Sequence, residues 1–484
     1  MYTRDYMIER NGKTYYPTIG LEIHAELATN SKMFCSCLNN PDEENPNINI
    51  CPVCMAHPGT LPVPNLTAIE SVIRVGLAIN NDTENIANFS EFDRKNYFYP
   101  DIPKGYQISQ YKYPIVSGGE LVGVKITRIH LEEDTATSKH DRGDFSLVDF
   151  NRAGVPLMEL VTEPVIHDAD TAMQFGKELQ LLLRTLGVSH ANMEKGEMRV
   201  ELNVSISDKS DVFGTKVEVK NLNSFSVVGR AAAYEIDRMI ALYEAGRQDE
   251  IVQETRGWDE NKSATFSQRR KENSNDYRYF PDPDLPKMQL HEMFDLKALK
   301  SNLPELPSQK RMRYANDYGI KPEDIESYVT DMKLGEFFET VANILGDKES
   351  IKVASNYITS DMLGLLAKDS NLQFPSPEHF AKLISMNVGG ELNSRGTKDI
   401  LAMLLVNDTD PEQLANEHGL IQKNDPDALR IIAQKHIDEN PSVVAEYKSG
   451  KEQLLMFFVG KIMKETGGSA NPALTQEILR ELLK

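Results

Sequence analysis

Hydrophobic and polar side chains alternate along residues 16–27. One parity is apolar, and the other places Glu22, His24 and Glu26 in a row. Because successive side chains of a strand point to opposite faces, this segment is predicted to be a half-buried strand with two acids flanking an imidazole. An ordinary solvated polar face is the alternative interpretation of this strand taken alone.

The same alternation recurs downstream, which favours a polar face shared by several strands. Segments 124–134, 199–206 and 214–224 alternate, and 157–163 is nearly all apolar with Glu159 embedded in it. A buried glutamate needs a cation or a proton as partner. Short connections between these strands predict an antiparallel sheet. The polar side chains expected on the shared face, here called the charged floor, are Glu22, His24, His130, Glu132, Glu159, Arg199, Glu201, Asn203, Lys216, Glu218 and Lys220.

Helical spacing of apolar residues predicts the elements that cover the other face of the sheet. Helices are expected at 67–80, with Thr67 as N-cap, at 170–186 and at 225–245. Segments beyond residue 307 have helical periodicity up to the C-terminus.

The predicted fold class is therefore α+β. An antiparallel-sheet domain over residues 1–300 is expected to precede two all-helical domains, 301–407 and 408–484. The boundary between the helical domains is placed at 407–412, which has the composition of a capped helix start.

Composition excludes some classes of protein. The chain is 40% hydrophobic and 26% charged, with a net charge of −20, and no apolar run approaches the roughly 18 residues that span a bilayer. Residues 1–7 do not resemble a signal or transit peptide, so a cytoplasmic location is expected. The acidity argues against extensive coating by nucleic acid, but it leaves local binding open. Residues 406–447 contain three Lys or Arg against nine Asp or Glu, whereas residues 448–484 contain six against four.

The four cysteines of the chain, Cys35, Cys37, Cys51 and Cys54, lie within twenty residues. In a reducing compartment this spacing predicts one tetrahedral Zn²⁺ site closed by four thiolates, and such a site is structural because it has no open position. Disulfide bonds are one alternative interpretation, and free cysteines that merely cluster are another.

Two segments combine aromatic residues with Lys and Arg. They are 92–110 and 276–286, and neither has a clean helical or strand period. Loops of this composition suit recognition of a nucleotide or a nucleic-acid end by stacking and charge. A purely structural loop with inward-packed tyrosines is the alternative.

The residue types on the charged floor predict phosphoryl chemistry. Mg²⁺ prefers a few carboxylates together with phosphate oxygens, and neighbouring Lys and Arg neutralise charge that develops on a transferred phosphoryl group. The sequence contains neither a P-loop motif nor a Gly-x-Gly-x-x-Gly motif. An ATP site, if present, is therefore expected on the sheet itself.

Several long segments resemble the GatB family of aspartyl/glutamyl-tRNA(Asn/Gln) amidotransferase subunits. The resemblance runs over nearly the whole chain and includes the end of the tail, which is similar to a YqeY-type domain. The segments concerned are 20–27, 92–101, 106–110, 132–134, 149–157, 220–225, 276–281, 459–464 and 470–472.

The resemblance implies an ATP-dependent ligase with a cradle-shaped catalytic domain similar to glutamine synthetase. Such an enzyme phosphorylates the side-chain carboxylate of Glu-tRNA(Gln) or Asp-tRNA(Asn), and ammonia then displaces the phosphate. It also implies two partner subunits, a GatA-type amidase that releases ammonia from glutamine and a small GatC-type subunit. The tail, 408–484, is expected to contact the outer corner of the tRNA.

Roles for individual residues also follow from the resemblance. Lys95 is expected on the ammonia route. A second glutamate next to Glu132 competes with it as a metal ligand, and strand parity favours Glu132. The predicted ligands of Mg²⁺ or Mn²⁺ are Glu22, His24, Glu132, Glu133 and Glu159. Glu159 is also counted as catalytic. The residues assigned to contacts with ATP or the acyl phosphate are Arg199, Glu201, Asn203, Lys216, Glu218 and Lys220. The predicted tRNA- or nucleotide-binding residues are Arg94, Tyr97, Tyr99, Arg278 and Tyr279.

The sequence departs from the family pattern at one point. The family has Asp-Ala-Gly-Lys after the paired glutamates, whereas this chain has Asp134-Thr-Ala-Thr, so Lys139 or His140 would have to replace the family's lysine.

Two alternative functions are considered for the chain: an archaeal-type subunit, and a non-catalytic tRNA-binding scaffold with a zinc knuckle. The choice between Glu-tRNA(Gln) and Asp-tRNA(Asn) is left open.

Overall fold

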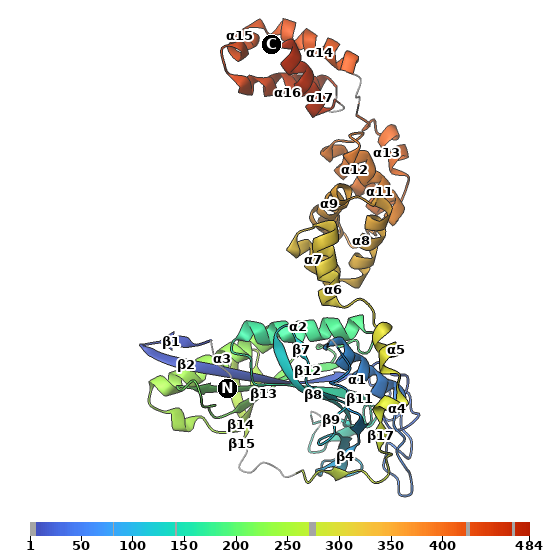
Figure 1. The fold of residues 1–484 in the computed structure, drawn as a ribbon, viewed down its shortest axis with the longest axis vertical. Coiled ribbons are helices and arrows are strands. Elements are labelled where there is room, and N and C mark those ends of the chain that lie inside the picture. The colour runs from blue at the N-terminus through green and yellow to red at the C-terminus, as the bar shows by residue number, and fades with distance from the viewer. Residues whose placement is uncertain (1–5, 81, 141–142, 271–276, 423–425, 467–469) are drawn as a thin grey trace. The chain divides into compact units, whose positions relative to one another are not determined.

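The computed structural model describes residues 6–80, 82–140, 143–270, 277–422, 426–466 and 470–484, without the side chains of 269 and 270. The chain divides into two compact units, Met1–Leu306 and Pro307–Lys484 (Figure 1). The first unit is built on a sheet, and the described part of the second contains helices and no strand. The predicted α+β class, with helices in the C-terminal region, is confirmed.

The first unit is organised around a 10-stranded sheet. Its main path runs in the order β15-β14-β13-β12-β2-β11-β8-β6, while β1 pairs with β2 and β7 pairs with β8. The strands are β1 (Ile8–Arg10), β2 (Lys13–Glu26), β6 (Val116–Ser117), β7 (Glu120–Leu121), β8 (Val124–Glu133), β11 (Pro156–Thr162), β12 (Met198–Ser207), β13 (Val217–Leu222), β14 (Glu254–Asp259) and β15 (Ala264–Arg270).

The sheet is antiparallel, as predicted, except at one pair. Strands β13 and β14 pair in parallel, with Val219 opposite Arg256. The chain between these two strands forms helix α3 (Phe225–Glu244) and then a short 3₁₀ turn, η1 (Gln248–Glu250). A helical crossover returns the chain in its original direction, so the expectation of antiparallel pairing alone fails at this pair.

The register brings the predicted polar positions into adjacent rows. Strand β11 lies between β2 and β8, and Glu159 is opposite His24 on one side and His130 on the other. On the far side of β2, strand β12 places Arg199 opposite His24 and Glu201 opposite Glu22. Because side chains directly opposite each other in neighbouring strands lie close together, this register creates a continuous polar surface.

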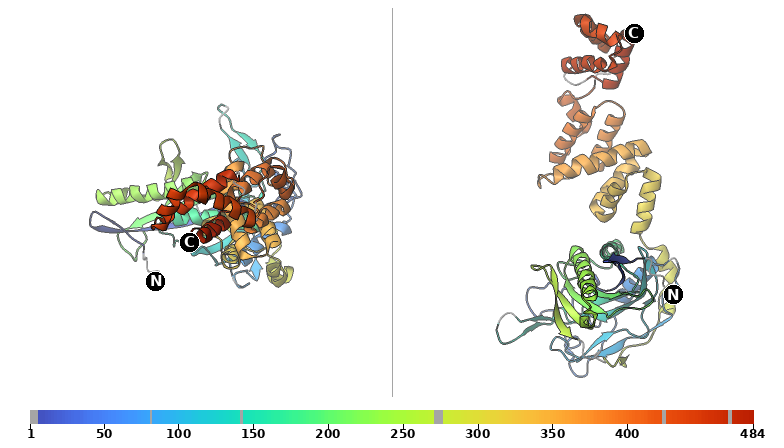
Figure 2. Two further views of the ribbon diagram at one scale, coloured as in Figure 1. Left: turned by 90° about the horizontal axis from the view of Figure 1, so that it is seen from above. Right: turned by 90° about the vertical axis from the view of Figure 1, so that its left-hand side faces the viewer.

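Helices cover the apolar face of the sheet (Figures 1 and 2). They are α1 (Leu66–Ala78), α2 (Ala169–Thr185) and α3, close to the predicted ranges. Ile23 of the sheet and Phe175 of α2 are completely buried in the shared core. The predicted N-cap of α1 is wrong by two residues. The Asn65 side chain accepts hydrogen bonds from the backbone N–H groups of Thr67 and Ala68, so Asn65 is the cap.

A small 3-stranded sheet, in the order β16-β4-β5, lies on the opposite side of the large sheet from α2 and α3 (Figures 1 and 2). Its strands are β4 (Asp93–Asn96), β5 (Tyr106–Ser109) and β16 (Phe280–Pro281). Strands therefore replace the loop predicted for 92–110. The period is hidden because these strands are very short and contain polar residues on both faces. The remaining elements of this unit are β3 (Phe89–Ser90), β9 (Thr137–Lys139), β10 (Leu147–Asp149), β17 (Met288–Gln289), α4 (Leu290–Met293) and α5 (Leu296–Ser301).

The second unit is helical throughout its described residues, as expected. Two π-helical segments, η2 (Tyr314–Tyr318) and η3 (Tyr357–Met362), continue the helices that precede them. The other helices are α6 (Pro307–Arg313), α7 (Pro322–Thr330), α8 (Met332–Leu345), α9 (Lys348–Asn356), α10 (Leu363–Leu366), α11 (Pro377–Val388), α12 (Ser394–Val406), α13 (Pro411–Glu417), α14 (Pro426–Glu439), α15 (Pro441–Lys448), η4 (Glu452–Leu454), α16 (Leu455–Glu465) and α17 (Pro472–Leu482).

The end of the second unit has a hydrophobic core of its own, which extends from Leu429 to Leu483. The predicted helix start at 407–412 is present, with Asp410 as N-cap of α13. Helix α13 packs against α11 and α12. The division of the helical region at 407 stays a prediction, and the packing of α13 favours a later boundary. Among the described residues, none of the helices has the length and apolar character needed to cross a membrane.

Candidate functional site

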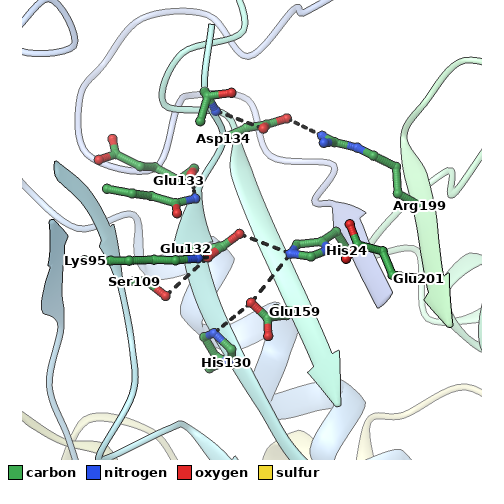
Figure 3. A network of polar contacts seen from close by, with 12 residues as sticks. His24, Lys95, Ser109, His130, Glu132, Glu133, Asp134, Glu159, Arg199 and Glu201 are labelled. Atoms are coloured by element: carbon green, nitrogen blue, oxygen red, sulfur yellow. Dashed lines mark hydrogen bonds and ion pairs between the residues drawn. The ribbon is translucent and has the colours of Figure 1, made fainter. Parts of the chain in front are cut away.

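Four side chains from three neighbouring strands meet on the charged floor (Figure 3). Nε2 of His24 lies 3.3 Å from Oε1 of Glu132 and 3.5 Å from Oε2 of Glu159. Nε2 of His130 lies 3.3 Å from the same oxygen of Glu159. We call His24, His130, Glu132 and Glu159 the central cluster. Sequence parity predicted His24, His130 and Glu132 on polar strand faces, and Glu159 was predicted as a buried glutamate that needs a partner; the strand register brings the four into contact.

Contacts among the side chains of the central cluster stabilise charged forms that burial alone would disfavour. Burial opposes the imidazolium of His24, but hydrogen bonds to Glu132 and Glu159 raise the pKa of His24 well above its ordinary value. Against the same desolvation, His130 and His24 hold the pKa of Glu159 well below the usual range. Burial likewise opposes the Glu132 carboxylate, but Lys95 and His24 lower its pKa. Both carboxylates are therefore ionised at neutral pH and attract cations.

The donor atoms of the cluster fit a divalent cation. The ligand atoms of Glu22, His24 and Glu159 lie within 4.8 Å of one another, and so do those of His130, Glu132 and Glu159. Carboxylate oxygens with one or two imidazole nitrogens form a donor set that Mg²⁺ or Mn²⁺ accepts, and a cation bound there would replace the proton on His24. Glu159 belongs to both groups, so it would be a ligand of a cation held by either one.

The two glutamates at the end of β8 face different surroundings. Glu132 belongs to the central cluster, as strand parity predicted. The Glu133 carboxylate instead accepts hydrogen bonds from Nζ of Lys104 at 2.7 Å and from the backbone N–H of Ile108 at 3.0 Å. Metal binding by either residue stays a prediction, and the geometry favours Glu132.

Lys95 reaches the central cluster from the small sheet. Its Nζ lies 4.0 Å from Oε2 of Glu132, and Oγ of Ser109 donates to the same oxygen at 3.3 Å. Burial alone would lower the pKa of Lys95, but the charge of Glu132 raises it. Lys95 is therefore an ammonium at neutral pH and acts as a hydrogen-bond donor rather than a base. The sequence gives no signal for Ser109 as a site residue, because its segment has the pattern of a loop.

A second group of charges lies beside the cluster on β12 and β13. Nζ of Lys220 lies 2.9 Å from Oε2 of Glu201 and 3.1 Å from Oε1 of Glu218. Burial raises the pKa of Glu22, and the nearby charges of Glu159 and Glu201 raise it further. Glu22 therefore lies between the two groups. Lys216 precedes β13 and is exposed, so it lies at the margin of the floor.

An arginine–carboxylate network adjoins the cluster, and only Arg199 among its members is predicted from the sequence as a site residue. Nη2 of Arg199 donates to Oδ2 of Asp134 at 2.7 Å, and Nε of Arg152 donates to the same oxygen at 2.5 Å. Nη2 of Arg152 also donates to Oε1 of Glu26 at 2.9 Å. Glu26 was placed on the face of Glu22 and His24 by parity, but it was not predicted as a site residue. Nothing local in the sequence links Arg152 to β2.

The residues proposed to replace the family's lysine do not join this network. Lys139 and His140 are exposed, and Nδ1 of His140 lies 2.7 Å from Oγ of Ser146.

The predicted tRNA- or nucleotide-binding residues separate into two sets. Tyr279 stacks on Tyr111 at 4.6 Å between ring centroids, and both contribute to a groove of about 660 Å³. This aromatic groove is lined by Glu91, Asp93, Tyr111, Lys112, Tyr277, Arg278, Tyr279 and Pro281. Nζ of Lys95 lies 5.3 Å from the ring centroid of Tyr277, so the groove adjoins the central cluster.

Arg94, Tyr97 and Tyr99 lie outside that groove lining. Arg94 pairs with Asp282 and Asp284, each at 2.9 Å, so its guanidinium is used in internal contacts. Tyr97 packs edge-on against Tyr277 at 6.0 Å, and Tyr99 is 65% exposed. Residue 276, which begins the motif 276–281, lies outside the described residues.

The four cysteines come together as predicted and are free thiols. All four sulfur atoms lie within 4.8 Å of one another, and Sγ of Cys51 and Cys54 are 3.8 Å apart. Four thiolates at 2.3 Å from a tetrahedral Zn²⁺ would be about 3.8 Å from one another. That separation is too long for a disulfide bond, which needs about 2.05 Å. The residues therefore fit a metal site, and the alternative of disulfide pairing fails in this structure.

Comparison with known proteins agrees with this geometry. The GatB/GatE catalytic domain matches residues 17–295, and the GatB domain of the YqeY type matches residues 336–483. The chain is 42% identical to the GatB subunit of the aspartyl/glutamyl-tRNA(Asn/Gln) amidotransferase of Crocosphaera subtropica, over 97% of this chain and 98% of that protein. The corresponding subunits of Thermotoga maritima and Persephonella marina are 42% and 41% identical, over 97% of this chain and 99% and 100% of theirs. The chain therefore belongs to the GatB family.

Proposed function

We propose that this chain is the subunit of a tRNA-dependent amidotransferase that activates and amidates the amino acid on misacylated tRNA. The substrates are Glu-tRNA(Gln), Asp-tRNA(Asn) or both, and the enzyme is an ATP-dependent carbon–nitrogen ligase. The observation that supports this most is the central cluster, because its carboxylates and histidines adjoin Lys95 and Arg199 on one floor. A non-catalytic scaffold would not require that combination.

The proposed chemistry has two steps. An oxygen of the substrate's side-chain carboxylate attacks the γ-phosphorus of ATP, forming a new P–O bond while the bond to the β-phosphate oxygen breaks and ADP leaves. Ammonia then attacks the carbonyl carbon of the acyl phosphate, inorganic phosphate leaves with the bonding electrons, and the nitrogen loses a proton to give the amide. Each step needs cations around the phosphate oxygens and a fixed position for the attacking atom.

The residues of the floor are suited to those requirements. Glu22, His24, Glu132 and Glu159 would hold Mg²⁺ or Mn²⁺, which supplies charge neutralisation on phosphate oxygens when bound. Lys95 and Arg199 would donate hydrogen bonds to the substrate from opposite sides of the cluster. Lys220, held between Glu201 and Glu218, provides a further fixed cation for the nucleotide. The cysteine site binds Zn²⁺ in a structural role.

The proposed partners follow from this division of labour. All four cysteines are assigned to zinc, so this chain offers no thiol nucleophile for glutamine hydrolysis. Ammonia would come from a GatA-type amidase subunit, with a GatC-type small subunit completing a heterotrimer. Charged tRNAs are cytoplasmic, so the proposed place of action is the cytoplasm.

The tail would bind the outer corner of the tRNA. Lys461 and Lys464 are exposed on α16, in the part of the chain where acidity is lowest. Replacing both by glutamate in the full chain should weaken tRNA binding and reduce the salt dependence of binding by about two released counterions. Unchanged affinity and salt slope would contradict this assignment.

The decisive experiment measures ATP hydrolysis by the chain assembled with its amidase and small subunits. We expect turnover that requires Mg²⁺ and appears only with Glu-tRNA(Gln) or Asp-tRNA(Asn), and that stops in the Glu22→Ala/His24→Ala double variant while tRNA affinity remains. Tight tRNA binding without ATP turnover by the unaltered complex would instead support the scaffold.

A further inference from the structure

Arg199 is anchored at one end and open at the other. Its Nη2 donates to Oδ2 of Asp134, and within the described part of the chain it makes no other hydrogen bond or ion pair. The side chain is 43% exposed. A guanidinium has five N–H donors, so most of those of Arg199 are available to a ligand. Arg199 lies opposite His24 in the β12–β2 register, so the residue stands beside the central cluster.

The carboxylate of Asp134 is buried and is held by several hydrogen bonds. Its side chain is 5% exposed, and its Oδ2 accepts from both Arg199 and Arg152. Its Oδ1 accepts from the backbone N–H of Thr135 at 2.9 Å. The carboxylate therefore cannot rotate without breaking several contacts. Figure 3 shows Arg199 extending from its strand towards Asp134, above His24.

Arg152 binds the same Asp134 carboxylate, but its bonding pattern differs from that of Arg199. It uses Nε on Asp134 and Nη2 on Glu26, so two edges of its guanidinium are occupied by carboxylates. Charge-assisted hydrogen bonds to two carboxylates hold a guanidinium in one position. Arg199 differs because only one terminal nitrogen is used. The contrast assigns Arg152 to holding Asp134 and leaves Arg199 as the group that can reach a substrate.

We infer that Asp134, held by Arg152, is the positioning residue that fixes the guanidinium of Arg199 where it donates hydrogen bonds to the phosphoryl group transferred on the floor. The inference rests on the proposed function and extends it. The floor contains Glu22, Glu132, Glu159 and Glu201, so a phosphate needs a fixed positive group to offset these charges.

A double-mutant cycle in the assembled complex tests this inference. Arg199→Met keeps the length of the side chain and removes its donors, and should lower kcat for amide formation about 100-fold. Asp134→Asn keeps the shape but weakens the anchor, and should lower kcat about 10- to 100-fold. If Asp134 acts only through Arg199, the double variant should be no slower than Arg199→Met, within about 3-fold.

Arg230 on α3 provides a matched control. Its side chain is 42% exposed, and it pairs with Glu260 at 2.6 Å. Arg230→Met should change kcat by no more than about 2-fold, as is usual for a surface substitution. Two independent structural defects would each lower kcat, and their losses would multiply in the double variant. If Asp134 acts by positioning Arg199, the two losses should not multiply.

Two results would overturn the inference while leaving the proposed function intact. One is unchanged kcat in Arg199→Met, and the other is a double variant whose loss equals the product of the single losses. Absence of tRNA-dependent ATP turnover in the unaltered complex would refute the proposed function instead. If Asp134→Asn does not fold, Arg152→Lys replaces it in the cycle, because it keeps the charge and loses the fork that holds Asp134. The same non-additivity with Arg199→Met is then expected.

Discussion

The carboxylate of Glu159 contacts the imidazole of His24 at 3.5 Å across the boundary between β11 and β2. The same carboxylate contacts His130 at 3.3 Å on the other side, and Nη2 of Arg128 lies 3.6 Å from its second oxygen. Glu159 therefore occupies the middle of the charged floor and balances groups from two neighbouring strands. The floor depends on this residue both for its charge and for the positions of its histidines.

Replacing Glu159 by glutamine should abolish metal binding while the chain still folds. The amide retains the volume but lacks the charge that both histidines and a divalent cation require. We expect kcat for tRNA-dependent ATP hydrolysis to fall about 100-fold or more, and calorimetric titration with Mn²⁺ to lose its heat signal.

Glu163 supplies the control for this substitution. It follows β11 directly, and its carboxylate accepts a hydrogen bond from Thr127 at 2.8 Å, away from the central cluster. Glu163→Gln should bind Mn²⁺ and turn over ATP as the unaltered chain does. Equal Mn²⁺ affinity in the two variants would contradict the placement of the metal.

The cysteine cluster should contain one equivalent of tightly bound zinc. Cys54 is the buried member of the set, and the backbone N–H of Cys51 donates to its sulfur at 3.1 Å. Cys54→Ser should abolish stoichiometric zinc, measured by elemental analysis, and lower the thermal midpoint. ATP turnover per folded molecule should persist because the proposed zinc is structural. Full zinc content in Cys54→Ser would refute the four-thiolate site.

Alternation along single strands predicted most of the charged floor. Glu22 and His24 on β2 and His130 and Glu132 on β8 could be assigned to one face of their strands by parity, because a period of two does not depend on the partner strand. Glu159 on β11 was identified instead as a glutamate embedded in a nearly apolar segment. Parity also favoured Glu132 over Glu133, and the structure places only Glu132 in the central cluster.

Contacts between distant segments could not be predicted in the same way. The register that sets Glu159 between His24 and His130 arises from pairing of segments far apart in the chain. Arg152 reaches Asp134 and Glu26 only because β8 and β11 are joined by a folded connection over the floor. The strands β4 and β5 were missed because polar residues on both faces of a short hairpin hide its period.

The aromatic groove should bind the nucleotide end that leads to the floor. Tyr279→Ala removes the ring that stacks on Tyr111. Loss of one base-stacking platform costs about 1–3 kcal/mol, so KM for the charged tRNA, for ATP or for both should rise by about 5- to 150-fold.

Separate KM values identify which ligand uses the groove. Tyr279→Phe keeps the ring and should behave like the unaltered chain, whereas Tyr99→Ala changes an exposed tyrosine that does not line the groove. Unaltered KM values for both substrates in Tyr279→Ala would exclude the groove as a binding site.

The stability of the helical unit should depend on the ionisation of Glu339. The hydroxyl of Tyr314 donates to Oε1 of Glu339 at 2.7 Å, Arg313 donates to the same oxygen, and Nζ of Lys310 lies 3.6 Å away. Burial opposes the carboxylate, but Tyr314 and Arg313 lower the pKa of Glu339 below its ordinary value. The ionised group therefore stabilises the folded state above the ordinary pKa of glutamate, and that contribution is lost as the pH falls through the lowered folded value.

Glu339→Gln should accordingly destabilise the helical unit by about 2 kcal/mol at pH 7, with a progressively smaller difference below about pH 4.5. Thermal unfolding of the full chain and its variant across this range measures the difference directly. Glu336→Gln, an exposed substitution on the same helix α8, is the control and should show little effect at any pH. A difference for Glu339→Gln that stays constant between pH 7 and pH 4 would show that packing rather than charge holds Arg313 and Tyr314 against α8.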